Sequence, residues 1–233
     1  MTSQPGKTDV SRPLDDGEYA YKKTFYQSAD VAENYDFHRL GSAGRQRRHL
    51  ANWKVIERAL DAAVGTSSVL DLPCGTGRFS RLIADRGCRV SCSDISLEMM
   101  SVARQVHSGI DKVTDFVQAD AEQLPYPDGA FDCVISLRFL HHVDGETRVN
   151  ILRELGRISS RWLIVDLRHR YGYHWLRWTV KRLFGRVSRM PPRLTRRQLE
   201  SEMTQAGLKI VRVFTVAPIF SDKWIVLAEP THS

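Results

Sequence analysis

Residues 67–79 read Ser-Ser-Val-Leu-Asp-Leu-Pro-Cys-Gly-Thr-Gly-Arg-Phe, and this stretch decides the fold of the chain. Its short apolar run indicates a buried strand, its two glycines indicate a tight loop, and apolar residues recur at helical spacing from Phe79 onward. Glycine lets the backbone approach a ligand where a Cβ atom would collide, and the first N–H groups of a helix lack partners within it. The stretch therefore predicts strand, loop and helix, with the loop as a cradle for a nucleotide-like cofactor.

Two features of this loop argue against a dinucleotide. The third glycine of the dinucleotide fingerprint would fall at position 80, where the chain has Ser80. The carboxylate of Asp71 precedes the loop, and it would repel a pyrophosphate but pair with an ammonium group. The expected ligand therefore has a cationic end.

The composition is that of a soluble globular protein. The chain has 233 residues, of which 42% are hydrophobic and 26% are charged, which suits one α/β domain with a modest addition. No apolar run approaches the roughly 20 residues needed to span a bilayer, and the polar residues 1–17 are expected to be a flexible tail. The four cysteines lack metal-like spacing, so buried reduced thiols are favoured over a redox pair and a cytoplasmic location is expected: Cys74, Cys88, Cys92 and Cys133.

Strand and helix patterns alternate along the chain after residue 66. Strands are predicted at about 89–94, 115–119, 130–136 and 162–167, with closing strands at 209–215 and 223–229. Helices are predicted at about 45–63, after Ser96, around the apolar stripe that starts at Val149, and from Thr195 to a stop at Gly207. This alternation predicts a doubly wound parallel sheet with its site at the carboxyl ends of the strands.

A carboxylate ends the second predicted strand. Asp94 lies 19 residues past Gly75, where a doubly wound fold holds the two hydroxyl groups of a ribose. A carboxylate suits that position because it accepts two O–H bonds at once. Asp94 is therefore a predicted cofactor-binding residue.

Four segments in order carry a resemblance to a known family. They are Val69-Leu-Asp-Leu-Pro-Cys-Gly-Thr-Gly77, Asp94-Ile-Ser96, Gln118-Ala-Asp-Ala-Glu-Gln-Leu-Pro125 and the segment from Phe131-Asp to Leu140-His-His-Val143. Together they resemble a class I S-adenosylmethionine-dependent methyltransferase of the type 11, or ubiquinone-biosynthesis-like, small-molecule group. The resemblance covers residues 67–167 and implies a Rossmann-like sheet of seven strands, mostly parallel, with an antiparallel C-terminal strand.

The resemblance also implies S-adenosyl-L-methionine as the cofactor and assigns residues to it. The methionine end would lie among Asp71, Cys74, Gly75 and Gly77, the ribose on Asp94, the adenine against Ile95, Asp120 and Ala121, and the sulfonium near Leu137. One position departs from the family, which usually has glycine where this chain has Pro73. Proline fixes φ and removes an N–H, so either the position uses an ordinary φ or the loop is altered.

The implied reaction is methyl transfer to a small, hydrophobic or anionic, lipid-like acceptor at oxygen or carbon. An oxygen or nitrogen nucleophile that carries a proton needs a base, and the candidates near the transfer point are His141, His142 and Asp166. A structural His-His pair is the competing interpretation. Two other functions stay open: an NAD(P)-dependent reductase, and a non-catalytic binding or adaptor protein.

The net charge of +7 is concentrated in one part of the chain. Residues 168–199 contain ten Lys or Arg and no acidic residue, so the rest of the chain is net acidic. Within residues 173–187 an apolar stripe (Leu176, Val180, Leu183, Val187) is flanked by Trp and Arg, a pattern that suits an anionic membrane surface. The alternatives are a lid helix that packs its stripe on the core and, less favoured because no recognised motif is present, nucleic acid binding.

The predicted organisation has five parts. A flexible tail (1–17) precedes an N-terminal helical lid (18–65), for which an extra helix covering the sheet is an equal alternative. The cofactor-binding core (66–167) is followed by a basic helical insertion (168–197), and a C-terminal helix with the closing strands (198–233) completes the same domain.

Overall fold

The computed structural model describes residues 41–171, 179–180, 182–184, 193–216 and 221–231. The predicted tail (1–17) and most of the predicted membrane-facing stretch (173–187) lie outside this part of the chain. The described elements are α3 (Ala43–Ala62), β1 (Ser68–Asp71), α4 (Arg78–Ala84), β2 (Arg89–Asp94), α5 (Leu97–Val106), β3 (Val113–Gln118), β4 (Phe131–Ser136), the 3₁₀ helix η1 (Leu140–His142), α6 (Gly145–Ile158), β5 (Ser159–Arg168), α8 (Arg196–Gln205), β6 (Leu208–Thr215) and β7 (Lys223–Pro230).

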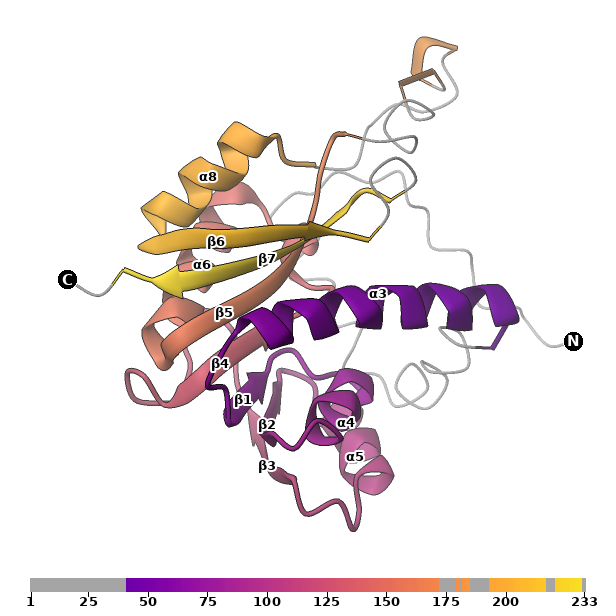
Figure 1. Cartoon of the computed structure of the whole chain (residues 1–233), viewed down its shortest axis with the longest axis vertical. Coiled ribbons are helices and arrows are strands. Elements are labelled where there is room, and N and C mark those ends of the chain that lie inside the picture. The colour runs from indigo at the N-terminus through magenta and orange to yellow at the C-terminus, as the bar shows by residue number, and fades with distance from the viewer. Residues whose placement is uncertain (1–40, 172–178, 181, 185–192, 217–220, 232–233) are drawn as a thin grey trace, which may run out of the picture.

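All seven strands form one sheet in the order β3-β2-β1-β4-β5-β7-β6 (Figure 1). The first five strands pair in parallel, whereas β7 is antiparallel to both of its neighbours, β5 and β6. The predicted seven-stranded, mostly parallel sheet with an antiparallel C-terminal strand is confirmed. Strand order reverses between β1 and β4, the point at which doubly wound sheets open a crevice for a ligand.

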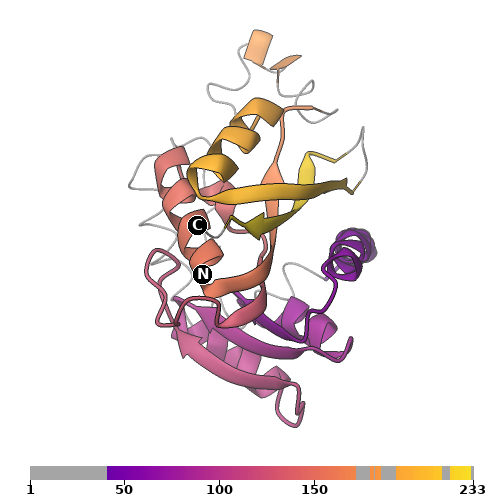
Figure 2. The same cartoon turned by 60° about the vertical axis from the view of Figure 1, so that its left-hand side comes forward.

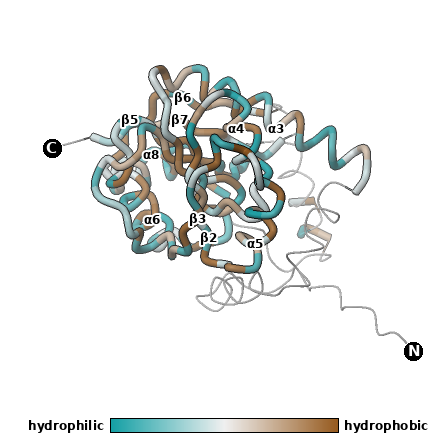
Figure 3. The backbone as a smooth tube through the Cα atoms, turned by 90° about the horizontal axis from the view of Figure 1, so that it is seen from below, coloured by the Kyte–Doolittle hydropathy of each residue, from teal (hydrophilic) through white to brown (hydrophobic). Residues whose placement is uncertain are grey.

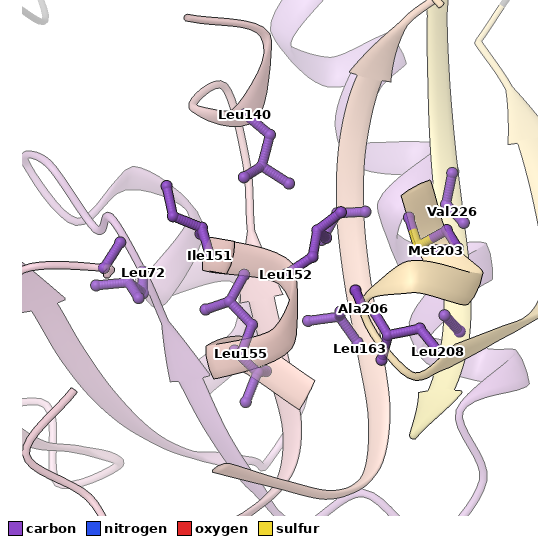
Figure 4. Close-up of a cluster of buried hydrophobic side chains, with 14 of the residues drawn as sticks. Leu72, Leu140, Ile151, Leu152, Leu155, Leu163, Met203, Ala206, Leu208 and Val226 are labelled. Atoms are coloured by element: carbon purple, nitrogen blue, oxygen red, sulfur yellow. The ribbon is translucent and has the colours of Figure 1, made fainter. Parts of the chain in front are cut away.

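Helices cover both faces of the sheet, as Figure 2 shows for α3 on one side and α6 and α8 on the other. Alternate residues of a strand point to opposite faces, so β1, β4, β5 and β7 each contribute to two hydrophobic clusters. One cluster joins α6 and α8 to the sheet, and in Figure 4 Ile151 lies on the Leu72 side of α6 while Met203 lies beside Val226. The other cluster joins α3 and α4 to Val69, Ile135, Ile164 and Leu227.

Three helices begin at side-chain caps that satisfy their first N–H groups. The Ser96 hydroxyl accepts a hydrogen bond from the backbone N–H of Met99, which confirms the predicted start of α5. Thr195 caps α8 together with Gln198, and Asp144 accepts from two backbone N–H groups at the start of α6. Because these capping residues follow loops at the sheet edge, they fix where each helix enters the fold.

Helix α3 packs as a cover on the sheet. Its buried residues, Trp53, Val55, Ile56, Ala59 and Leu60, belong to the cluster on that face of the sheet. Its N-terminal part is exposed, and hydrophilic colour predominates there in Figure 3. Helix α3 therefore covers this face of the sheet. Residues 18–40, the rest of the predicted lid, lie outside the described part.

The ends of the predicted basic insertion belong to regular elements. Arg168 is the last residue of β5, and its carbonyl accepts a hydrogen bond from the backbone N–H of Leu194. Arg196 and Arg197 lie in α8. These arginines therefore belong to β5 and α8, although they lie within residues 168–197, the range predicted for the insertion.

Candidate functional site

A cavity of about 290 Å³ lies at the carboxyl ends of β1, β2 and β4. The residues that line it come from the loops after these strands and after β3 and β5. Those predicted from the sequence are Cys74, Gly75, Asp94, Ile95, Asp120, Ala121, Leu137, His141 and His142. The structure brings these nine residues together, while the remaining three, Asp71, Gly77 and Asp166, are absent from the lining.

The loop after β1 is tied to the end of β2. The Gly75 N–H donates to Oδ2 of Asp94 (2.8 Å), and the Cys74 N–H donates to the Ser93 carbonyl (2.8 Å). Gly75 has a positive φ of 56°, and a Cβ at this position would meet no atom within 4 Å. Gly75 also lines the cavity, so this bare stretch of backbone borders the space where a ligand would lie.

Asp94 is buried and accepts hydrogen bonds through both carboxylate oxygens. Oδ2 accepts from the Gly75 N–H, and Oδ1 accepts from the Ser96 N–H (2.9 Å). Burial raises the pKa of Asp94, and the N–H groups of Ser96 and Gly75 oppose that shift because they stabilise the charged form. The carboxylate is thus held rigidly at the cavity wall, in the place predicted for a ribose.

Gly77 serves the loop in another way. Its φ is 79°, and an added Cβ would collide with the ring of His107. His107 is buried, and its Nδ1 donates to the Ala103 carbonyl (2.6 Å), which anchors the ring on α5. The second glycine of the loop therefore allows close packing between the start of α4 and the end of α5. Its contact with a cofactor stays a prediction.

Asp71 lies behind the loop, away from the cavity lining. Its side chain is 2% exposed, and Oδ2 accepts a hydrogen bond from the Ser80 hydroxyl (2.6 Å). Burial raises its pKa to about 7, although the bond from Ser80 lowers it. The structure does not place this carboxylate beside the other predicted cofactor residues, so its pairing with an ammonium group stays a prediction.

The residues after β2 and β3 form the neighbouring wall of the cavity. The side-chain amide of Gln118 donates to the Ile95 carbonyl (2.9 Å), which joins the two strand ends. Oδ1 of Asp120 accepts from the Glu122 N–H (3.2 Å), and Ala121 is buried beside it. A carboxylate and an apolar surface therefore meet where the resemblance implies an adenine.

The segment after β4 begins with a strained turn held by Asp166. Arg138 has a positive φ of 63°, and its N–H donates to Oδ1 of Asp166 (2.5 Å). Oδ2 of Asp166 binds the ammonium group of Lys223 (3.0 Å). Burial alone would raise the pKa of Asp166, but Lys223 and the other donors lower it to about 2.

This environment argues against Asp166 as a catalytic base, a role that stays a prediction. A carboxylate with so low a pKa takes up a proton poorly at neutral pH, and both of its oxygens have partners. Asp166 instead positions the Arg138 backbone and hence the chain that leads to His141.

The two adjacent histidines line the cavity, and their rings contact each other at an interplanar angle of 41°. Their ring centroids are 4.0 Å apart. Burial, with the nearby His142, holds the pKa of His141 well below its usual value, so its imidazole is neutral at physiological pH. The Nδ1 atom of His141 is buried and has no hydrogen-bond partner among the described residues. Both histidines border the cavity, so each stays a predicted candidate for exchanging a proton with a ligand.

Several lining residues were missed by the sequence analysis. Phe79, Met99 and Phe139 add apolar surface, and Arg78, Arg138 and Arg168 add positive charge. Phe79 also stacks with Trp53 of α3 (6.5 Å between centroids). A helix-spacing signal identified Phe79 only as a core residue, and the charge pattern assigned Arg168 only to the insertion. Neither helical spacing nor charge pattern indicates which side chains line a cavity.

The cysteines show no pairing. All four are free thiols, and Cys74, Cys92 and Cys133 are buried. A hydrogen bond with Cys92, together with burial, raises the pKa of Cys74 well above its usual value. Buried thiols, as expected from the sequence, are found at three of the four positions, whereas Cys88 is half-buried.

Comparison with known proteins agrees with this geometry. Residues 69–160 match a family model described as a methyltransferase domain. The chain is 37% identical over 140 residues to the ubiquinone/menaquinone biosynthesis C-methyltransferase UbiE of Pseudomonas paraeruginosa, an alignment that covers 55% of this chain and 53% of the relative. A relative of the same name from Pseudomonas putida is 36% identical over 139 residues, with the same coverage. The chain thus spans about half the length of the curated relatives it matches.

Two solved structures share the fold over most of their length. The magnesium protoporphyrin IX methyltransferase of Synechocystis PCC 6803, with bound SAH, has a TM-score of 0.70 and 19% identity, and the alignment covers 91% of this chain and 99% of that one. An S-adenosylmethionine-dependent methyltransferase from Mesorhizobium loti has a TM-score of 0.58 and 21% identity, with 76% and 97% covered.

The antiparallel β7 and these likenesses do not favour the nicotinamide-dependent alternative. The resemblance inferred from the sequence motifs is confirmed for the core of the chain. Residues 69–160 match a methyltransferase domain, and the chain is similar over 140 residues to ubiquinone/menaquinone biosynthesis C-methyltransferases.

Proposed function

We propose that this protein transfers a methyl group from S-adenosyl-L-methionine to oxygen or carbon of a small, hydrophobic or anionic acceptor. The observation that carries the proposal is the cavity at the strand-order reversal, where the open Gly75 loop faces the buried carboxylate of Asp94. The motif-bearing relatives are methyltransferases by name, which supports the same reaction class.

The residues around the cavity suit this cofactor. Asp94 and Asp120 offer carboxylate oxygens to hydroxyl and amino groups, and Ile95, Met99 and Leu137 offer apolar surface to a flat ring. The bare backbone at Gly75 leaves space for the methionine end. When bound, the cofactor supplies an activated methyl group on a positively charged sulfur.

The work of the protein is then mainly positioning. Methyl transfer is an in-line displacement with a good leaving group, so holding the reacting atoms about 3–3.5 Å apart provides much of the acceleration. His142 would accept a proton from the acceptor where the attacked atom carries one, and Asp166 would act only through the Arg138 turn. The aromatic rings of Phe79 and Phe139 support a hydrophobic acceptor.

Calorimetric titration with S-adenosylmethionine and with its demethylated product tests the cofactor directly. Wild type should bind both, and Asp94→Asn should bind at least tenfold more weakly, because one buried charge-assisted acceptor is replaced by a donor. Asp128→Asn is the matched control, since that exposed carboxylate lies outside the cavity lining. Absence of heat with both compounds, together with stabilisation by NAD(P)H, would support the reductase instead.

Formation of a methylated product distinguishes an enzyme from a non-catalytic adaptor protein. Isotope-labelled methyl donor, incubated with metabolite and lipid extracts, should label a product only when active protein is present. Cofactor binding without any labelled product from these extracts would favour a non-catalytic binding protein.

A second proposal concerns peripheral contact with an anionic membrane through residues 173–187. Two residues of the apolar stripe are described, and both face solvent: Val180 is 42% exposed and Leu183 is 79% exposed. Phe184, next to them, is 75% exposed. A stripe packed on the core would bury Val180 and Leu183, so their exposure favours a lipid surface over a core-packed lid helix.

Sedimentation with anionic liposomes tests this contact. Binding should weaken as salt rises, and neutralising Arg177, Lys181 and Arg182 should abolish it. Leu183→Ser should weaken binding without changing its salt dependence, because it removes apolar surface and no charge. Among the described residues, no helix has the length and apolar character required to cross a bilayer. If neither salt nor any of these substitutions alters the amount of protein that sediments with the liposomes, the membrane proposal is wrong.

A further inference from the structure

A second cavity, of about 280 Å³, lies beside the first, between the end of β5, the start of α6 and α8. Four arginines line it, Arg148, Arg168, Arg170 and Arg193, and among its described lining residues Glu202 is the one acidic side chain. Since a water molecule occupies about 30 Å³, the cavity has room for a phosphate or carboxylate group with several waters. Its lining is therefore strongly positive and large enough for an anion.

The acids near this cavity leave part of the positive charge uncompensated. Arg148 forms a two-pronged bond to Glu202 (2.7 and 2.6 Å), so that pair is neutral. Arg168 and Arg193 share one carboxylate, that of Asp222. The Nε of Arg170 donates to the Arg193 carbonyl (3.1 Å), which ties these two lining residues together.

Arg193 shows most directly that these arginines lack enough hydrogen-bond acceptors. Its side chain is 8% exposed, and one terminal nitrogen donates to Asp222. The Nε and Nη1 atoms are buried and have no hydrogen-bond partner within the part of the chain that the structure describes. Buried donors without partners are rare in folded proteins and cost free energy, so a charged guanidinium with two such nitrogens indicates a missing acceptor.

The two cavities share a wall. His141 and Arg168 line both of them. A molecule with its anionic end among the arginines would therefore extend past these two residues towards the proposed cofactor. Asp94 and Asp120 line only the first cavity, so a negative group in the second would not share its walls with these carboxylates.

We propose that the cavity lined by Arg168, Arg170 and Arg193 binds the anionic group, a phosphate or a carboxylate, of the methyl acceptor. This inference rests on the proposed function, since it names the chemistry of the molecule methylated there. The planar guanidinium group suits both anions because its N–H donors match pairs of their oxygens. The acceptor class is then an amphiphile or a small acid whose negative end is held in the cavity next to the one that holds the reacting atom.

Titration of the full-length protein with inorganic phosphate and with benzoate, each with and without saturating demethylated cofactor, tests the anion site. At least one anion should bind, and Arg170→Gln and Arg193→Gln should weaken it by about tenfold. Arg193→Gln also removes one of the two cations paired with the buried Asp222 and so risks the fold, whereas Arg170 is exposed and its variant should fold normally. Arg89→Gln is the control. It removes one exposed charge at the amino end of β2, opposite the strand ends that border the cavities, and should leave anion binding unchanged.

The two proposals fail separately. Cofactor binding with no anion binding, or with anion binding equally strong in Arg170→Gln and Arg89→Gln, would overturn the anion site and leave the methyltransferase intact. Anion binding without cofactor binding would overturn the proposed function. In labelled extracts the methylated product should be retained on an anion-exchange column, and a product that is neutral at pH 7 would also overturn the inference.

Discussion

The contact between Gly77 and His107 couples the site loop to the packing of α5. We predict that Gly77→Ala lowers the free energy of unfolding by about 2–4 kcal/mol, because the new Cβ adds a strained positive φ and a clash with the ring. Chemical denaturation measures this loss.

Gly87→Ala is the control for this prediction. Gly87 also has a positive φ (90°), but a Cβ there would meet nothing within 4 Å. Its loss should therefore be only about 1–2 kcal/mol, from the backbone alone. Equal losses at both glycines would show that the ring of His107 moves aside without cost.

Asp71 should make stability depend on pH near neutrality. Its folded pKa, about 7, lies above its unfolded value near 4 because burial disfavours the charge. The stability it contributes is therefore fully present below about pH 4 and is lost as pH rises through 7. Relative to Asp71→Asn, the unliganded wild type should lose about 1–3 kcal/mol between pH 5 and pH 8.

Unfolding curves of both proteins across this pH range provide the test. Carboxylates with low folded pKa values, such as Asp166 and Asp222, are common to both proteins and cancel in the difference. A constant difference from pH 5 to pH 8 would show that Asp71 stays charged in the folded protein.

At single residues, sequence reasoning succeeded where the chain geometry is local. Ser96 follows a strand and precedes apolar helical spacing, and the structure confirms it as a cap. Asp94 ends a strand whose neighbour carries the glycine loop, so its place at the cavity follows from the parallel sheet. Asp71 also ends a strand, but its side chain turns to Ser80, nine residues on, and motif spacing does not report that direction.

At the level of elements, an ion pair links β5 to β7 beneath the site. Asp166 and Lys223 are largely buried and bonded (3.0 Å), and Asp166 also holds the Arg138 turn. Lys223→Met should cost about 3–5 kcal/mol of stability, because it leaves a buried carboxylate without its cation. The double variant with Asp166→Asn should recover part of this loss.

The surface pair Lys209–Glu229 joins β6 to β7 and is the matched control. Lys209 is 68% exposed, so Lys209→Met should have a far smaller effect on stability. Denaturation of the two single variants and the double variant measures the coupling. Additive losses for Asp166→Asn and Lys223→Met would show that the buried pair contributes no interaction energy.

Periodicity predicted the elements well because each strand and helix carries its own apolar pattern. The second strand, for example, was expected at 89–94 and is found at Arg89–Asp94. The pairing of Lys223 with Asp166 was not foreseen, since it depends on β7 entering the sheet between β5 and β6. Contacts across 57 residues of sequence leave no local pattern, and the same limit applies to Asp222, which binds Arg168 and Arg193.

At the scale of the whole molecule, the sheet joins two hydrophobic clusters into one cooperative unit. Consecutive residues of β7 show this, because Val226 belongs to the cluster under α6 and α8 whereas Leu227 belongs to the cluster under α3 and α4. Both side chains are fully buried. Damage on either face is therefore transmitted through the same strand.

We predict that Val226→Ala and Leu227→Ala each lower the midpoint of one shared thermal transition. Leu227→Ala should cost about 2–5 kcal/mol, which corresponds to roughly 5–15 °C for a chain of this length, and Val226→Ala somewhat less because it removes a smaller side chain. Val211→Ala in β6 should shift the midpoint little, since Val211 is 46% exposed. Calorimetry that resolves two transitions, with each variant moving only one of them, would contradict this prediction. It would show that the cluster packed against α6 and α8 unfolds independently of the cluster packed against α3 and α4.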